Sequence, residues 1–153
     1  HNLRKRIKSV TKYFAIANHD ILSGNQELVV FKSRDEHTEE IKKGSVDWII
    51  ADVPCTGSGT WARNPEHLAF FAKRKIAAYA MVQVAIINSA WNFLRSDGKL
   101  VYMTCSVYKR ENEDVIENFL SSNPGAHLES MQYFGQNEGG DILFQAVLSK
   151  TKD

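Results

Sequence analysis

The sequence predicts an α/β protein with a Rossmann-like, mostly parallel sheet and flanking helices, folded as a single domain over residues 1–153. Two short apolar runs, residues 46–51 and 99–104, have the continuity of strands that are buried on both faces. A long helical pattern separates them. Strand, helix and strand in this order are typical of parallel pairing through a crossover helix.

Composition places the chain among ordinary globular domains. Hydrophobic residues make up 43% of its 153 residues and charged residues 24%, which argues against disorder and fibrous repeats. A net charge of +1 neither requires nor excludes a nucleic-acid partner. No apolar run reaches the ~20 residues of a membrane span, and no signal peptide opens the sequence. We therefore expect a cytoplasmic protein with no membrane partner and with both cysteines reduced.

The first 45 residues predict a helix, a strand and a polar segment. Apolar residues recur at three- and four-residue steps over residues 3–14, which indicates an amphipathic helix. Its basic residues, which include Arg4 and Lys5, are either a solvated face or a contact for RNA phosphates. Residues 28–31 read as a strand, and the acidic segment 32–45 follows it.

The middle of the chain predicts a buried strand, a loop, a helix and a second strand. The strand at 46–51 ends at Asp52, and a glycine-rich loop follows at 56–60. A cap, a proline and an acid at 64–66 begin a helix that continues to about Leu94, with a break expected near Lys73. Residues 96–98 (Ser-Asp-Gly) are expected to end this helix before the strand at 99–104. The mostly apolar face of the predicted helix comprises Ile76, Tyr79, Ala80, Gln83, Ile86, Ile87, Ala90 and Leu94.

The last third predicts one more helix and one more strand. Residues 111–114 (Glu-Asn-Glu-Asp) read as an acidic first turn that complements the dipole of a helix running to Leu120. A turn is expected at 123–125, and a loop at 139–141 precedes a terminal strand at 142–148.

Both cysteines follow a predicted strand. Cys55 comes after the strand that ends at Ala51, and Cys105 after the strand that ends at Thr104. Neighbouring strands lie ~4.8 Å apart, and ligands of open α/β sheets bind beyond the carboxyl ends of the strands. We therefore expect the two thiols to meet at one rim of the sheet, with Asp52 beside them.

Simpler interpretations of the cysteines stay open. Either one can be a small buried apolar residue, while a disulfide is disfavoured in a reducing compartment. No histidine is spaced beside a cysteine as in zinc fingers, so no metal is expected. The glycine loop lacks the Gly-Lys-Ser/Thr ending of a P-loop. Gly57 and Gly59 either let the loop bend or allow the close approach of a ligand.

The motifs around the two cysteines resemble those of the Sun/Fmu family of RNA cytosine-C5 methyltransferases. Residues 52–60 and 63–66 read DVPCTGSGT and RNPE, similar to the family's "DAPCSGTG…RRHPE". Residues 98–106 and 111–113 read GKLVYMTCS and ENE, similar to "GGRLVYSTCS…EENE". The tail at 140–146, GDILFQA, is similar to "GDGFFYA", with Ile142 where the family has glycine.

This resemblance implies methyl transfer from S-adenosylmethionine to C5 of a cytosine in RNA, with ribosomal RNA as the expected substrate. It assigns the nucleophile that adds to C6 to Cys105 and release of the methylated product to Cys55. Asp52 would hold the exocyclic amine and N3 of the base. Covalent catalysis of this kind divides a difficult transfer into easier steps. A free thiol has a pKa near 8.5, so Cys105 requires a lowered pKa.

Cofactor and RNA contacts are also carried over from the family. Asp52 and Pro54 would lie against S-adenosylmethionine, and Asp35 is the nearest substitute for an acid that would align with residues 32–33. The family's glycine-rich cofactor loop has no counterpart here. Arg63 is expected to contact RNA, as are Arg4 and Lys5, although a structural salt bridge is an equal alternative for Arg63.

The departures predict that the chain is the carboxyl-terminal portion of a class I methyltransferase catalytic domain. We expect it to lack most of the cofactor's binding residues, to be inactive in isolation, and to expose a sheet edge through which it self-associates. Two rivals stay open. One is a DNA cytosine-C5 methyltransferase, in which Cys55 would attack. The other is a non-catalytic RNA-binding or partner module that retains the fold.

Overall fold

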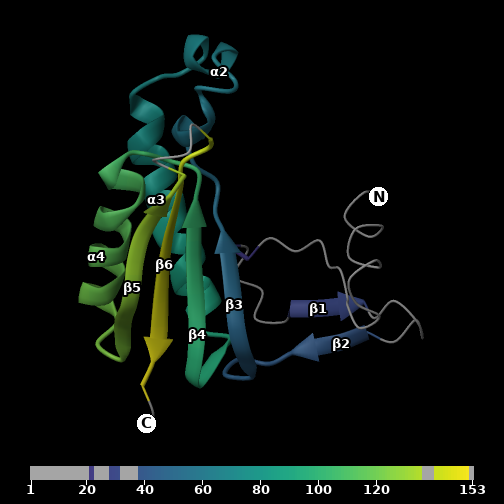
Figure 1. Ribbon diagram of the computed structural model, residues 1–153. Coiled ribbons are helices and arrows are strands. Elements are labelled where there is room, and N and C mark those ends of the chain that lie inside the picture. The colour runs from purple at the N-terminus through teal and green to yellow at the C-terminus, as the bar shows by residue number, and fades with distance from the viewer. Residues whose placement is uncertain (1–20, 23–27, 32–37, 136–139, 152–153) are drawn as a thin grey trace.

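The computed structural model describes residues 21–22, 28–31, 38–135 and 140–151 (Figure 1). Within them a four-stranded sheet carries helices on one of its faces, which confirms the predicted α/β class. The helix predicted at residues 3–14 lies outside the described residues, as do Arg4, Lys5 and Asp35.

The four-stranded sheet is mixed. Its strands are β3 (Val46–Asp52), β4 (Leu94–Thr104), β5 (Ala126–Phe134) and β6 (Leu143–Lys150), in the order β3-β4-β6-β5. Only β3 and β4 are parallel among the described pairs, and β6 runs antiparallel to both of its neighbours. The expectation of mostly parallel pairing is corrected here. The connection from β5 to β6 is too short for a crossover helix, so these strands form a hairpin.

Two strands went unpredicted because their sequences are too polar. β1 (Leu28–Phe31) lies where the sequence predicts it, and it pairs in a separate antiparallel sheet with β2 (Thr38–Ile41), which reads Thr-Glu-Glu-Ile. β5 forms an edge of the main sheet, and most of its residues are exposed. Neither β2 nor β5 carries the apolar run or clean alternation on which recognition of a strand depends.

The predicted long helix divides in two, which confirms the break near Lys73. A short helix, α2 (Glu66–Ala69), is followed by α3 (Arg74–Trp91). The predicted helix end near Leu94 is wrong. α3 ends at Trp91, and β4 begins at Leu94, whose side chain is fully buried in the hydrophobic core. Residues 96–98 therefore lie inside β4, where a shift in register accompanies the positive φ of Asp97.

The hydrophobic core lies between the sheet and two helices, α3 and α4 (Glu113–Ser122). Figure 1 shows both helices on the same side of the strands. Alternate side chains of β4 and β6 point toward them, as the period of two requires. The fully buried members are Ile87, Leu94, Leu100, Tyr102, Phe119, Phe144, Ala146 and Leu148. Among the described helices, none is long and apolar enough to cross a membrane.

The opposite face of β3 is open among the described residues. Trp48 and Ile50 are 58% and 70% exposed, while Ala51 on the helix side is buried. β3 therefore departs from the expectation of burial on both faces. It also hydrogen-bonds to β4 alone among the described strands. Self-association through this edge stays a prediction.

The core assignment predicts contrasting effects for two leucines of β6. Replacing fully buried Leu148 with alanine leaves a cavity and should lower the free energy of unfolding by about 3 kcal/mol. The matched change Leu143→Ala, at a side chain 39% exposed, should cost less than about 1 kcal/mol. Urea denaturation followed by circular dichroism measures both, and equal losses would contradict the described core.

Candidate active site at the carboxyl ends of β3 and β4

The parallel pairing of β3 and β4 brings the two cysteines together. Asp52 pairs with Met103, and the N–H of Val53 donates to the carbonyl of Met103 at 3.2 Å. Both chains then leave the sheet at the same edge. The Sγ atoms of Cys55 and Cys105 lie 3.3 Å apart, and both residues are free, partly buried thiols. The predicted meeting of the thiols is confirmed, and we name this pair the cysteine rim.

The pKa values of the two thiols are shifted in opposite directions. Hydrogen bonding from the Cys55 thiol lowers the pKa of Cys105 to about 7, although partial burial and the negative charges of Asp52 and Asp141 oppose this shift. The same hydrogen bond, with burial, raises the pKa of Cys55. The rim therefore holds a protonated donor, Cys55, beside a sulfur that is readily ionised, Cys105. Since the thiolate is the reactive form of cysteine, Cys105 is the better nucleophile.

A buried carboxylate joins the two loops that carry the cysteines. Glu111, in the short 3-10 helix η2 (Lys109–Glu111), has no exposed surface. Its oxygens accept hydrogen bonds from the Thr56 N–H at 2.8 Å, the Thr56 hydroxyl at 2.6 Å and the Ser106 hydroxyl. Thr56 follows Cys55 and Ser106 follows Cys105. One side chain thus holds the residues next to both sulfurs.

Further hydrogen bonds fix the same two loops. The Ser58 hydroxyl lies 3.2 Å from that of Ser106 and accepts the N–H of Val107 at 2.9 Å. The carbonyl of Glu111 accepts the buried hydroxyl of Tyr102 from β4. Buried hydroxyls and a buried carboxylate are stable only when they are hydrogen-bonded. The network therefore makes the position of each sulfur depend on that of the other.

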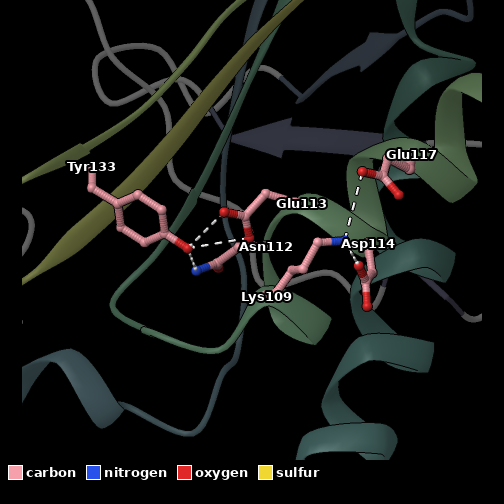
Figure 2. A network of polar contacts seen from close by, with 6 residues as sticks. All are labelled: Lys109, Asn112, Glu113, Asp114, Glu117 and Tyr133. Atoms are coloured by element: carbon pink, nitrogen blue, oxygen red, sulfur yellow. Dashed lines mark hydrogen bonds and ion pairs between the residues drawn. The ribbon is translucent and has the colours of Figure 1, made fainter.

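Asn112 connects the rim to the far edge of the sheet. Its buried amide accepts the Thr104 hydroxyl at 2.6 Å and donates to the Ser106 carbonyl at 2.8 Å. It also donates to the hydroxyl of Tyr133 on β5 at 3.0 Å, and that hydroxyl donates in turn to Glu113 (Figure 2). The start of α4 is thereby fixed both to the end of β4 and to β5.

The glycine loop has a structural explanation at two positions. Gly57 has a φ of +71°, the left-handed conformation that glycine adopts without strain. A Cβ at Gly59 would lie 2.2 Å from the carbonyl oxygen of Ile142. The Gly59 N–H donates to the Cys105 carbonyl at 2.8 Å, and its own carbonyl accepts the N–H of Ile142. The close approach at Gly59 is therefore to the chain's own backbone.

Asp52 and Pro54 lie at the open end of β3. Both are exposed, and Asp52 forms no ion pair with the described residues. Buried Gln83 of α3 donates to the Pro54 carbonyl at 2.8 Å and so holds this loop on the helix. A carboxylate that is exposed and has no ion-pair partner in the described part of the chain fits a cationic ligand such as a sulfonium, so Asp52 is compatible with S-adenosylmethionine.

Arg63 forms an ion pair with Asp141, which precedes β6. This is the structural salt bridge that the sequence left as one alternative. Most of the Arg63 side chain, 73%, nevertheless stays exposed. Its guanidinium can therefore reach a phosphate, and RNA contact by Arg63 stays a proposal.

Sequence reasoning missed three residues of the site. It interpreted Glu111 as part of a helix's first turn, but α4 begins at Glu113. The sequence places Asn112 and Asp141 only within motifs and assigns neither a role of its own. A carboxylate and an amide directly before a helix, close behind a cysteine, were the available signal. The part of the chain that the structure describes contains no group of three or more metal-ligating side chains.

Comparisons with known proteins identify the family of the chain. The family model described as 16S rRNA methyltransferase RsmB/F matches residues 4–148. The ribosomal RNA small subunit methyltransferase B of Klebsiella pneumoniae is 36% identical over 115 residues, which cover 70% of this chain and 27% of that protein. The same enzyme of Proteus mirabilis is 35% identical, with 68% and 25% covered. The chain spans about a quarter of the length of these curated relatives.

A solved structure has the same fold. NSun6 from Pyrococcus horikoshii, crystallised with SFG, superposes with a TM-score of 0.60 at 27% identity, over 76% of this chain and 31% of that one.

The hydrogen bonds of Glu111 predict that its replacement destabilises the protein more than replacement of an exposed glutamate does. Glu111→Ala leaves the Thr56 N–H and the Ser106 hydroxyl without their acceptor, so the free energy of unfolding should fall by about 3 kcal/mol. Glu117→Ala, on the exposed face of α4, should change it by about 0.5 kcal/mol or less. Urea denaturation compares the two variants, and similar values would contradict the role given to Glu111.

The acidities of the rim predict pH-dependent alkylation. At pH 7 about half of Cys105 should be thiolate, and its reaction with iodoacetamide should slow about tenfold per pH unit further below its pKa. Cys55→Ala removes the hydrogen bond to the thiolate. The pKa of Cys105 should then rise, leaving a few per cent thiolate at pH 7. Peptide mass spectrometry measures each rate, and faster alkylation of Cys55 at pH 7 would reverse the assignment.

Proposed function

Because the chain belongs to the 16S rRNA methyltransferase RsmB/F family, we propose that it carries the base-handling chemistry of an RNA cytosine-C5 methyltransferase. We place its 153 residues in the carboxyl-terminal portion of the catalytic domain. The supporting observation is the cysteine rim, where an ionisable sulfur lies 3.3 Å from a thiol donor. Ribosomal RNA is the proposed substrate.

Cys105 is the proposed nucleophile. Its thiolate adds to C6 of the cytosine, so that an S–C6 bond forms and the electron pair of the C5–C6 double bond moves onto the ring. C5 thereby becomes nucleophilic. The lowered pKa of Cys105 supplies the thiolate near neutral pH without a separate base.

Cys55 is proposed to assist release of the product. Once C5 carries the methyl group, a solvent water takes the C5 proton and the C5–H bonding pair re-forms the C5–C6 double bond. The S–C6 bond breaks in the same step, and its bonding pair returns to the sulfur of Cys105. A thiol 3.3 Å away donates a hydrogen bond to this departing thiolate. The raised pKa of Cys55 keeps that donor protonated, so its role differs from that of Cys105.

Asp52 and Pro54 are proposed to lie between base and cofactor. Asp52 accepts a hydrogen bond from the exocyclic amine and holds a proton at N3, which supports addition at C6. S-adenosylmethionine, when bound, supplies an electrophilic methyl group. The exposed Asp52 carboxylate and Pro54 would form part of its site, and Asp35 is proposed to complete it.

Arg63 is proposed to contact RNA phosphates beside the rim, where its exposed guanidinium also neutralises Asp141. Arg4 and Lys5 are proposed to extend this contact. The target cytosine must leave its stack to reach the rim, which favours single-stranded RNA or a flipped base.

A covalent trap tests the assignment. The full-length protein, incubated with S-adenosylmethionine and RNA that contains 5-fluorocytosine, should form an adduct on Cys105, because fluorine at C5 prevents loss of the C5 substituent. Cys105→Ala should abolish the adduct, while Cys55→Ala should retain it. Gel shift and peptide mass spectrometry identify the sulfur.

Two other outcomes would each replace the proposal. An adduct that requires Cys55 and survives Cys105→Ala would indicate the mechanism of DNA cytosine-C5 methyltransferases. RNA binding without any adduct would indicate a non-catalytic RNA-binding module.

A further inference from the structure

A pocket lined by aromatic residues opens next to the cysteine rim. It has a volume of about 180 Å³, and its walls include the aromatic side chains of Trp61, Phe70, Phe71 and Tyr79. Thr56, which directly follows Cys55, forms another part of the wall. One residue of the pocket wall is thus bonded directly to Cys55. We name it the aromatic pocket.

Most of the aromatic rings here pack against one another, while Phe70 is left exposed. Phe71 packs edge-on to Trp61 at 4.9 Å between centroids, and it stacks on Tyr108 at 5.8 Å with only 11° between the planes. Phe70 is 77% exposed, the largest exposure of any bulky apolar side chain among the described residues. Exposed aromatic rings beside a groove are how proteins bind the bases of single-stranded nucleic acids.

Positive charge lies beside the aromatic pocket. Lys75 lines it, and Lys73 and Arg74 directly precede Lys75 at the start of α3. Lys73 and Arg74 are exposed and form no ion pair with the described residues, so their charges are available to a ligand. The first turn of α3 contains no acidic residue to neutralise them. This combination favours an anionic ligand that also carries a planar ring.

The size of the aromatic pocket limits what can enter. Pockets that enclose whole small-molecule ligands measure ~300–1,000 Å³, so a volume of about 180 Å³ fits a single ring system. An RNA strand that presents one base to the cysteine rim carries its neighbouring base on the same backbone. Phosphates of that backbone would pass the exposed lysines.

We propose that the aromatic pocket binds the nucleobase next to the target cytosine, with Phe70 as its stacking platform and Lys73, Arg74 and Lys75 as its phosphate contacts. This inference rests on the proposed function and adds a second base-binding position to it. The neighbouring base would anchor the strand and thereby set which cytosine reaches Cys105.

Binding of short RNA tests the pocket directly. The full-length protein is titrated with a fluorescent single-stranded oligoribonucleotide that contains one cytosine. Phe70→Ala should weaken binding about 5- to 100-fold, the range measured for loss of one base–aromatic stack. Lys75→Gln should lower the salt dependence by about one phosphate contact. Met81→Ala, at an equally exposed side chain of α3 outside the pocket, should bind like the wild type.

Abasic oligonucleotides show whether a neighbouring base is what Phe70 contacts. An abasic nucleotide on one side of the cytosine should weaken binding by the wild type about as much as Phe70→Ala does. In Phe70→Ala the same lesion should have little further effect. The proposal is overturned if abasic lesions on both sides weaken the two proteins equally, or if Phe70→Ala binds like Met81→Ala. Binding of a peptide but not of RNA would also overturn it.

These binding experiments can contradict the aromatic pocket without contradicting the proposed function, and the reverse also holds. If the 5-fluorocytosine adduct forms at Cys105 but binding is independent of Phe70, only the aromatic pocket is wrongly assigned. If binding depends on Phe70 and on a neighbouring base but no adduct forms, the base-binding site stands and the methyltransferase chemistry does not.

Discussion

The site depends on one buried carboxylate. Glu111 has no exposed surface, and it accepts hydrogen bonds from the residues that directly follow Cys55 and Cys105. Burying a charge is strongly unfavourable without such partners. The loops after β3 and β4 are therefore held at a fixed separation, and the 3.3 Å contact between the sulfurs follows from it. The same carboxylate joins the site to α4, which starts two residues later.

A short contact between two identical groups becomes useful because their surroundings differ. The hydrogen bond between the sulfurs lowers the pKa of Cys105 and raises that of Cys55. Cys105 is therefore the thiol that ionises first, while Cys55 keeps its proton and remains a hydrogen-bond donor. Asp52 and Asp141 oppose ionisation of Cys105, and the ion pair with Arg63 neutralises one of them. The chemistry proposed for the rim thus depends on a balance of nearby charges as much as on the sulfurs.

The surface around the rim divides into two regions of different character. On one side, the end of β3 presents Asp52 and Pro54, both exposed, in the region proposed for the cofactor. In the other region, the aromatic pocket is lined by Thr56 and by Lys75 of α3. Cys55 lies between these two regions in the sequence.

The sequence by itself determined the α/β class, the presence of strands at 46–51 and 99–104, the break near Lys73 and the meeting of the two cysteines. These features follow from local apolar runs and from the geometry of adjacent parallel strands. Only the tertiary structure decided the mixed sheet, since β5 is a polar edge strand whose pairing is set by the hairpin to β6. It also decided that Glu111 accepts a hydrogen bond from Thr56 in the loop after β3, and that Gly59 lies against the backbone of Ile142. The first of these contacts joins residues 55 positions apart and the second joins residues 83 positions apart. No local pattern encodes which distant donor a buried acceptor will meet.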